Sequence, residues 1–230
     1  MVSRISIGRE TKDLFLEILP AKTRRAFREL AKSPLLAGSR WYLAGGTALA
    51  LQAGHRQSVD LDFFTQAKSF DIPEWERKLL ATDNWETTHR AEGTLYGTFF
   101  GAKVSFIVYP FFVPSQSYLR VGNLKIIKPE DIAAMKIIAI SQRGKKRDFF
   151  DLYWHCHNRG PLETVIDRAI KQYPYQQHNI GHIYNSLSYF ADAEDDPMPK
   201  IFFRANWKEI KQYFQKEMRR ITRKFVGLEN

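Results

Sequence analysis

The sequence has very little cysteine and no long apolar segment. Cys156 is its only cysteine, which excludes an internal disulfide framework and any zinc site built from several cysteines. The longest nearly unbroken apolar run, residues 106–113, contains Pro110 and is far shorter than the roughly 20 residues that span a bilayer. The opening residues, MVSRISIGRE, lack the apolar stretch of a secretory signal. These absences predict a soluble cytoplasmic protein in a reducing compartment.

The sequence does contain enough apolar residues for a packed core, together with an excess of positive charge. Of its 230 residues, 44% are hydrophobic and 14% aromatic, which excludes disorder over most of the length. Thirty-five Lys and Arg against 25 Asp and Glu give a formal net charge of +10 at pH 7. Such an excess favours binding to polyanions such as RNA, DNA or nucleotide phosphates, although it does not establish it.

Apolar periodicity divides the sequence into a mixed first part and a helical second part. Strands are expected at residues 40–44, 58–64, 85–91, 94–100, 103–109 and 124–127, with a hairpin turn at Gly101-Ala102. Helices are expected at residues 11–19 with Thr11 as cap, 20–33, 47–53, from 71 onward, from 128 through 139, and at 148–157, 162–172, 180–189 and 207–225. We therefore expect an α+β fold, with an α/β lobe over residues 1–128 and a helical lobe over residues 129–230.

The final predicted helix combines an apolar stripe with strongly basic remaining faces. Its stripe consists of Trp207, Ile210, Phe214, Met218, Ile221 and Phe225, spaced three or four residues apart. Between Lys200 and Phe225 there are nine Lys or Arg residues and two Glu. We interpret the aromatic residues of the stripe as packing residues.

Asp60-Leu61-Asp62 is the main candidate for chemistry. On a strand, residues two apart point the same way, so the two carboxylates would lie side by side. Two oxygen ligands at this spacing suit Mg²⁺, which also takes water and phosphate oxygens. The alternative is an ordinary solvated strand edge. The apolar flanks favour the metal site, because paired carboxylates in a largely buried strand are costly without compensation.

Gly45-Gly46-Thr47 stands upstream, between a predicted strand and a predicted helix. Glycine lets backbone N–H groups approach a phosphate, and a helix N-terminus favours an anion. Thr47 could cap the helix or donate its hydroxyl to a phosphate oxygen. The alternative is a tight turn with a threonine cap. Arg56 and Ser58 precede the acids, and Arg56 is either a phosphate contact or a surface charge.

These segments resemble a known family. LAGGTALAL followed by HRQSVDLDFF is similar to the first motif of nucleotidyltransferases, and in particular of the AbiEii/AbiGii toxin family of bacterial toxin–antitoxin and abortive-infection systems. The resemblance continues through residues 102–111, 127–154 and 189–199. It implies a nucleotidyltransferase-like fold in which the helical lobe completes the active-site cleft.

The resemblance also implies functional residues in the second lobe. A lysine and an aspartate of the family match Lys136 and Asp148, with Asp151 and Arg143 as support. Lys136 interrupts an apolar helix, so its ammonium group must find an anion or water; the alternative is a lysine that reaches the surface. Asp148 is either an orienting group or base, or the salt-bridged start of a helix. In the functional interpretation, the basic run before it, Arg143, Lys145, Lys146 and Arg147, contacts nucleotide or RNA phosphates.

Many nucleotidyltransferases carry a third carboxylate on a neighbouring strand. The corresponding position here is Ser105, which leaves the general base unassigned, with Asp148 the best substitute. This departure favours a second hypothesis: a catalytically degenerate nucleotidyltransferase fold that binds RNA or a partner protein. A metal-dependent phosphohydrolase is a third.

The resemblance favours an enzyme that transfers a nucleoside monophosphate from an NTP to an acceptor and releases pyrophosphate. Asp60 and Asp62 would hold Mg²⁺, or Mn²⁺ in its place; the nucleotide would be bound by Gly45, Gly46, Thr47, Arg56, Ser58 and Lys136; and the catalytic set would be Asp60, Asp62, Lys136 and Asp148. The basic charge and the relatives suggest RNA, and tRNA in particular, as acceptor, with a protein acceptor left open. The resemblance also implies a cognate antitoxin, and the short apolar runs predict no association with membranes.

Other polar residues carry weaker signals. His155 and His157 point apart on a helix and lack further ligands, and Cys156 is typical of a core cysteine. His178 and His182 are spaced for one helix face, but nothing else supports a metal there. Asp192, Glu194, Asp195 and Asp196 form an acidic turn that is either solvated or bound to a basic surface.

Overall fold

The computed structural model describes residues 14–115, 117–174 and 179–225. The chain divides into two compact units, the first ending at Pro129 and the second beginning at Glu130. No helix within the described ranges has the length and apolar character needed to cross a bilayer. The predicted cap Thr11 lies outside the described residues.

The first unit is built on a seven-stranded mixed sheet in the order β3-β4-β5-β2-β1-β7-β6. The strands are β1 (Tyr42–Ala44), β2 (Leu61–Thr65), β3 (Trp85–Ala91), β4 (Thr94–Phe99), β5 (Ala102–Val108), β6 (Leu119–Val121) and β7 (Leu124–Ile126). All six predicted strands are present, with ends that shift by at most three residues, and β6 is a strand that the prediction missed. The predicted hairpin turn is displaced by one residue, since Phe100 and Gly101 take the positive φ angles of 50° and 72°.

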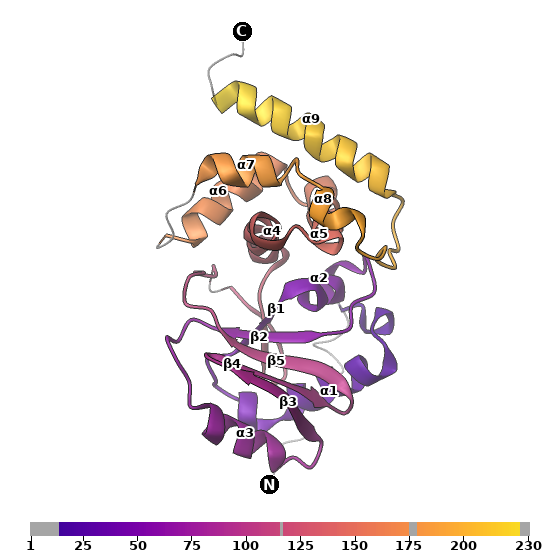
Figure 1. The fold of residues 1–230 in the computed structure, drawn as a ribbon. Coiled ribbons are helices and arrows are strands. Elements are labelled where there is room, and N and C mark those ends of the chain that lie inside the picture. The colour runs from indigo at the N-terminus through magenta and orange to yellow at the C-terminus, as the bar shows by residue number, and fades with distance from the viewer. Residues whose placement is uncertain (1–13, 116, 175–178, 226–230) are drawn as a thin grey trace. The chain divides into compact units, whose positions relative to one another are not determined.

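Helices lie on both faces of this sheet (Figure 1). On one face is α2 (Gly45–Ala53), and on the other are α1 (Ala21–Lys32) and α3 (Ile72–Leu80). The helix predicted from residue 11 is only a single 3₁₀ turn in the described chain, Leu16–Ile18, and a second such turn follows α1 at Pro34–Leu36. The prediction placed Gly45-Gly46 in a turn before a helix at Thr47, whereas α2 begins at Gly45 itself.

The face that α3 covers carries an aromatic core. Phe106 on β5 stacks against Phe63 on β2, with ring centroids 5.2 Å apart, and Trp41 and Trp75 meet its edges at 5.1 and 5.4 Å. Phe63 and Phe106 are fully buried or nearly so. Because successive strand residues alternate between faces, burying Phe63 on this side turns Asp62 toward the α2 side.

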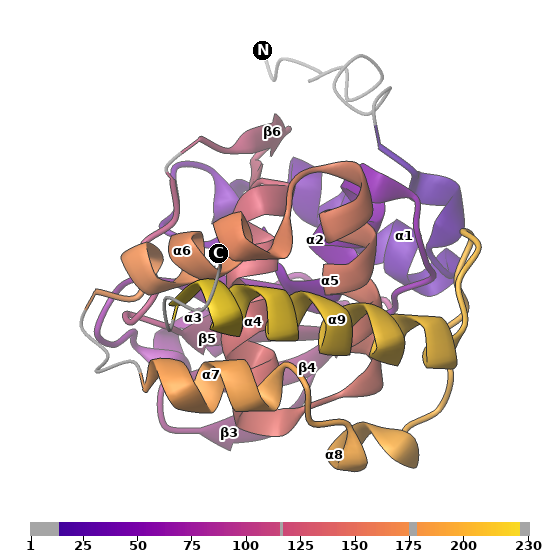
Figure 2. The ribbon, with the colours of Figure 1, turned by 90° about the horizontal axis from the view of Figure 1, so that it is seen from above.

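Helices make up most of the second unit over its described residues (Figure 2). Its helices are α4 (Pro129–Arg143, which begins at the last residue of the first unit), α5 (Lys146–Asn158), α6 (Leu162–Gln172), α7 (Ile180–Ser186), α8 (Ala191–Glu194) and α9 (Trp207–Phe225). The predicted helices are all present, and α8 is a short helix within the segment predicted to be an acidic turn. These elements confirm the predicted α+β class.

The apolar stripe of α9 is the packing face that the spacing predicts. Ile210, Phe214, Met218 and Ile221 are at most 3% exposed. Phe214 meets Phe149 of α5 edge to face, with ring centroids 5.4 Å apart, and Phe149 also contacts Trp207 at 5.7 Å. The α5–α9 contact therefore forms the centre of this unit.

Phe214→Ala removes a fully buried ring from this contact and should lower the free energy of unfolding by about 3–5 kcal/mol. Urea denaturation followed by circular dichroism measures the change. Phe202→Ala, at a side chain that is 50% exposed, is the matched control and should change the stability by less than about 0.5 kcal/mol. Equal losses in the two variants would contradict the proposed core.

Candidate active site

The first turn of α2 packs closely against β2. Gly45 has φ +71°, and a Cβ atom there would lie 3.2 Å from Asp62 Oδ2. An L-amino acid side chain is disfavoured at that φ and has little room beside the carboxylate. Glycine at this position therefore lets the first turn of α2 approach the acidic side chain closely.

A second neighbour, Arg56, occupies the space that a side chain at position 46 would need. A Cβ atom on Gly46 would lie 2.3 Å from Arg56 Nη2 and 3.3 Å from Ser58 Oγ. Arg56 is only 4% exposed and donates from Nη1 to the carbonyl oxygen of Gln57 (2.9 Å). The alternative of a surface charge is therefore wrong: the guanidinium is buried against the N-terminal turn of a helix.

Thr47 connects the glycine turn to the acidic segment. Its hydroxyl is hydrogen-bonded to Ser58 Oγ (2.8 Å) and to the carbonyl oxygen of Asp60. The Thr47 side chain is 1% exposed, and the N-cap position of α2 belongs to Ala44. The predicted capping role of Thr47 is therefore wrong, because its hydroxyl instead ties α2 to the chain before β2.

The two acids differ in placement. Asp62 lies in β2 opposite Ser105 of the parallel strand β5, and Ser105 Oγ donates to Asp62 Oδ1 (2.6 Å). Asp60 precedes the strand, which begins at Leu61, so the prediction that both acids lie on one strand is wrong. Asp60 Oδ1 is buried and has no hydrogen-bond partner among the described residues. Sequence reasoning missed both this orphaned oxygen and the hydrogen bond from Ser105.

The donor set of the first unit fits a hard cation. Asp60 has a buried carboxylate oxygen without a partner, and Asp62 follows two residues later at the start of β2; carboxylate oxygens are the ligands that Mg²⁺ prefers. No group of three or more His, Cys, Asp or Glu side chains arranged to hold a metal occurs within the part of the chain that the structure describes. Asp60 and Asp62 are thus the residues that would hold such an ion, which also takes water and substrate oxygens as ligands.

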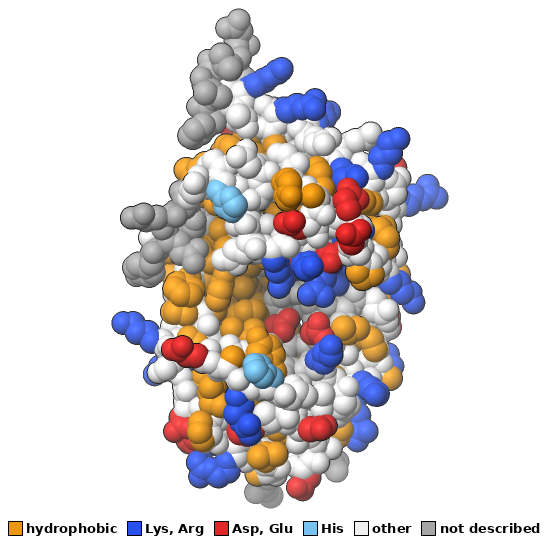
Figure 3. Space-filling view, viewed as in Figure 1, with side chains coloured by type: hydrophobic (Ala, Val, Ile, Leu, Met, Phe, Trp, Pro, Cys, Tyr) orange, Lys and Arg blue, Asp and Glu red, His pale blue; other side chains and the backbone are white. Residues whose placement is uncertain are grey.

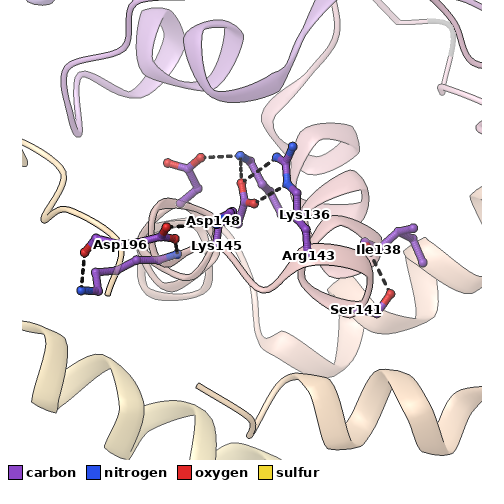
Figure 4. A network of polar contacts seen from close by, with 9 residues as sticks. Lys136, Ile138, Ser141, Arg143, Lys145, Asp148 and Asp196 are labelled. Carbon is purple, nitrogen blue, oxygen red and sulfur yellow. Dashed lines mark hydrogen bonds and ion pairs between the residues drawn. The ribbon is translucent and has the colours of Figure 1, made fainter. Parts of the chain in front are cut away.

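The second unit contains a buried charge network on α4 and α5 (Figure 4). Lys136 Nζ lies 2.5 Å from Asp148 Oδ1 and 2.7 Å from Asp151 Oδ2. The side chains are 6%, 0% and 0% exposed, respectively. The ammonium group therefore does not reach the surface: it is bound between two buried carboxylates one helical turn apart.

Arg143 supplies the second positive charge of this network. Its Nε lies 3.1 Å from Asp148 Oδ2, while its side chain is 51% exposed. Burial by itself raises the pKa of Asp148, but Lys136 and Arg143 outweigh burial, and the pKa lies below its ordinary value of 3.8. Two cations thus face two carboxylates, and Asp148 stays ionised at neutral pH.

The rest of the basic run is bound within the protein. Lys145 Nζ pairs with Asp196 Oδ1 (3.1 Å), and Lys146 Nζ donates to the carbonyl oxygens of Glu194 (2.9 Å) and Asp196 (2.6 Å). The alternative that the acidic segment binds a basic surface is therefore confirmed. The prediction that the whole run contacts phosphates is not supported at Lys145 and Lys146.

The remaining candidates behave as packing residues. His155 is buried, and desolvation lowers its pKa to about 4, so the ring is neutral at pH 7. Burial raises the pKa of the Cys156 thiol to about 12, which makes it a poor nucleophile. The exposed His182 bonds the carbonyl oxygen of Ser141 through Nε2 (2.9 Å), and His178 lies outside the described residues.

Comparison with known proteins decides the family. The model of the nucleotidyl transferase AbiEii toxin, a type IV toxin–antitoxin family, matches residues 28–93 and 102–224. The chain belongs to the AbiEii nucleotidyl transferase toxin family. Every candidate residue described above falls within the matched ranges.

Individual proteins are also similar to this chain. An uncharacterised protein of Aquifex aeolicus, aq_aa25, is 33% identical over 182 residues, which are 78% of this chain and 86% of the relative. Among solved structures, the nucleotidyltransferase toxin MenT4 of Mycobacterium tuberculosis superposes with a TM-score of 0.51 at 16% identity, over 86% of this AbiEii family member and 84% of MenT4. JHP933 from Helicobacter pylori gives a TM-score of 0.46 at 17% identity, over 92% and 100% of the two chains. The fold is that of a nucleotidyltransferase.

Gly46→Ala should destabilise the first unit by about 1–3 kcal/mol, because the new methyl group overlaps the buried Arg56 guanidinium. Gly160→Ala is the control, since nothing lies within 4 Å of a Cβ atom there, and its unfolding free energy should stay within about 0.5 kcal/mol of the wild type. Urea denaturation measures both. A tolerated Gly46→Ala would show that the turn is not closely packed.

Lys136→Met leaves Asp148 and Asp151 buried without their shared cation and should cost about 3–5 kcal/mol at pH 7. In the wild type, the depressed pKa of Asp148 contributes stability that is present at neutral pH and lost as the pH falls below about 4. In the variant, protonation of the carboxylates relieves the uncompensated charge. The difference in unfolding free energy between the wild type and Lys136→Met should therefore be smaller at pH 5 than at pH 7. Lys171→Met, at an exposed lysine of α6, is the control. In urea denaturation its unfolding free energy should equal that of the wild type at both pH values.

Proposed function

We propose that this protein is a Mg²⁺-dependent nucleotidyltransferase that moves a nucleoside monophosphate from an NTP onto an RNA acceptor. The observation that carries the proposal is the contact between the first turn of α2 and the acidic segment: Gly45 lies against Asp62, and Thr47 is bound to Asp60. The first contact places the anion-binding N–H groups of a helix N-terminus close to the Asp62 carboxylate, and the second ties α2 to the main chain at Asp60. Membership of the AbiEii family supports the same chemistry.

The triphosphate is assigned to the start of α2. The backbone N–H groups of the first turn have no partner within the helix and carry the positive end of its dipole. The buried guanidinium of Arg56 adds a full positive charge next to Gly46. Thr47 and Ser58 act as positioning residues, since their hydroxyl groups hold the turn to the acidic segment.

Asp60 and Asp62 would hold Mg²⁺, or Mn²⁺, through Asp60 Oδ1 and the Asp62 carboxylate. When bound, the ion neutralises charge that develops on the phosphate oxygens and aligns them for in-line displacement. Ser105 fixes one oxygen of Asp62 by its hydrogen bond, so a neutral hydroxyl group stands where many nucleotidyltransferases have a third acid. In the reaction an acceptor hydroxyl oxygen attacks the α-phosphorus, the bond from that phosphorus to the bridging oxygen breaks, and pyrophosphate leaves as the hydroxyl proton passes to solvent.

Lys136, Asp148, Asp151 and Arg143 are assigned to the same reaction. The lowered pKa of Asp148 makes it a weak base at pH 7, so we assign it the orienting role rather than proton removal. It holds Lys136 and Arg143 in fixed positions. We propose Lys136 as a cation that acts on the triphosphate, and the half-exposed Arg143 as a residue that binds a phosphate.

The net charge of the protein supports the proposed acceptor, and its family supports the proposed partner protein. A formal charge of +10 suits RNA, and we propose tRNA as the RNA class. The toxin–antitoxin family and the resemblance to the MenT4 toxin support a cognate antitoxin. We propose the cytoplasm, where tRNA and NTPs occur, as the compartment of this activity.

The second candidate function is RNA or partner binding by a fold that has lost catalysis. The observation that favours it is Ser105, which cannot bind a metal as an anion or accept a proton as a base at neutral pH. The two candidates differ in whether Asp60 and Asp62 act on a nucleotide.

Incubation of the protein with Mg²⁺, total tRNA and each of the four α-³²P-NTPs tests the proposal. Label should enter RNA and pyrophosphate should be released, and Asp60→Asn or Asp62→Asn should lower the rate about 100-fold or more. Asp83→Asn is the matched control, because Asp83 is exposed and its φ of +56° suits asparagine. This variant should keep the wild-type rate.

Other outcomes of the same experiment decide between the alternatives. Label in protein rather than RNA would change the acceptor. RNA binding without label from any NTP would favour the degenerate fold, and orthophosphate release without label transfer would favour a phosphohydrolase.

A further inference from the structure

The cations of α9 fall into two groups. Lys211 pairs with Glu194 (2.6 Å), Arg220 with Glu217 (3.0 Å) and Glu163 (3.5 Å), and Lys224 with Glu163 (2.6 Å). The other four, Lys208, Lys216, Arg219 and Arg223, are exposed and make no ion pair with a described residue. The paired cations are therefore largely neutralised, and the other four carry the free charge of the helix.

The four unpaired cations lie on one face. At 100° per residue they fall within an arc of roughly 80°, on the side opposite the buried stripe that contains Ile210 and Phe214, whereas the paired cations flank that stripe. From Lys208 to Arg223 they extend over about 22 Å. We call these four residues the outer face of α9, and Figure 3 shows Lys and Arg side chains projecting along this helix. Glu209 in the first turn is engaged by the backbone N–H of Asn206 (3.0 Å).

A groove of about 500 Å³ adjoins this face, between α7 and α9. Arg219 and Arg223 line it together with Tyr184, Met218 and the polar side chains of Asn185, Ser188, Gln215 and Thr222. Figure 2 shows α7 and α9 side by side. Burial, together with Asp167 and Glu163, raises the pKa of Tyr184, so its phenol keeps its proton at neutral pH. An aromatic ring, an apolar floor and hydrogen-bonding groups next to two arginines suit a nucleotide whose phosphate lies on the rim.

We propose that the outer face of α9 and the adjoining groove form an RNA-docking surface, which binds the sugar–phosphate backbone through Lys208, Lys216, Arg219 and Arg223 and holds one nucleotide in the groove. This inference rests on the proposed RNA acceptor and adds where the second unit binds it. RNA is favoured over an acidic protein because arginine pairs with phosphate bidentately and the groove is sized for a nucleotide rather than for a row of carboxylate side chains.

The experiment measures binding without catalysis. Fluorescence anisotropy with a 5′-fluorescein-labelled 20-nucleotide polyuridylate, in EDTA and without NTP, gives Kd over a series of salt concentrations. Arg219→Gln/Arg223→Gln should raise Kd roughly tenfold at 0.1 M salt and lower the slope of log Kd against log salt by about 1.5, because two phosphate contacts are lost. The control Lys211→Gln/Arg220→Gln removes the same charge from the same helix, at cations already paired, and should change Kd less than about twofold.

The outcomes separate docking from transfer. Loss of binding in the outer-face variant supports docking even if the wild type labels no RNA, a result that would remove only the proposed transfer. Equal effects of the two double variants, or no effect of either, would overturn docking even where label transfer persists. Competition by poly-L-glutamate of equal charge as effective as that by unlabelled RNA would assign the surface to an acidic protein instead.

Discussion

The structure of the candidate site depends on one steric constraint: the first turn of α2 leaves no space for a side chain. Gly45 faces the Asp62 carboxylate, and Gly46 lies under the Arg56 guanidinium. Any larger residue would push the helix away from β2 and separate its N–H groups from the acids. The contact between Thr47 and the Asp60 carbonyl then fixes the distance along the chain between the helix and the segment that precedes β2. A backbone feature, rather than a set of side chains, thus determines where the polar groups meet.

The second unit contains buried charged side chains that must be compensated. Asp148 and Asp151 are fully buried, which would be very costly if either were alone. Lys136 and Arg143 supply two positive charges, and their geometry leaves the network electrically neutral. Replacing such a network by apolar residues is often neutral for stability, so its presence is better explained by the position it imposes on Lys136 than by the stability it contributes.

The elements could be predicted from local patterns because their apolar periods are strong, as the stripe of α9 and the hairpin around Gly101 illustrate. What failed depended on contacts remote in sequence. Whether a strand begins at Ser58 or Leu61 is decided by pairing with β1 and β5, so Asp60 was wrongly placed on the strand. The role of Thr47 was hidden because its partner is a main-chain carbonyl 13 residues away. In the sequence, Lys145 and Lys146 have the pattern of phosphate ligands. Only the structure shows that both ammonium groups are hydrogen-bonded to residues 194–196.

The way in which Lys146 is bound has a consequence for how relatives of this protein can vary. Its ammonium group donates to the main-chain carbonyl oxygens of Glu194 and Asp196, and it also lies over the Trp207 ring, 5.5 Å from the centroid. Every residue type has a carbonyl group, so the side chain at position 194 can drift without loosening this attachment. The lysine has no such latitude, because no other side chain offers a cation with three donors on an equally long stem. The attachment of Lys146 therefore constrains position 146 and places no demand on the side chain at position 194, whose carboxylate is bound separately by Lys211.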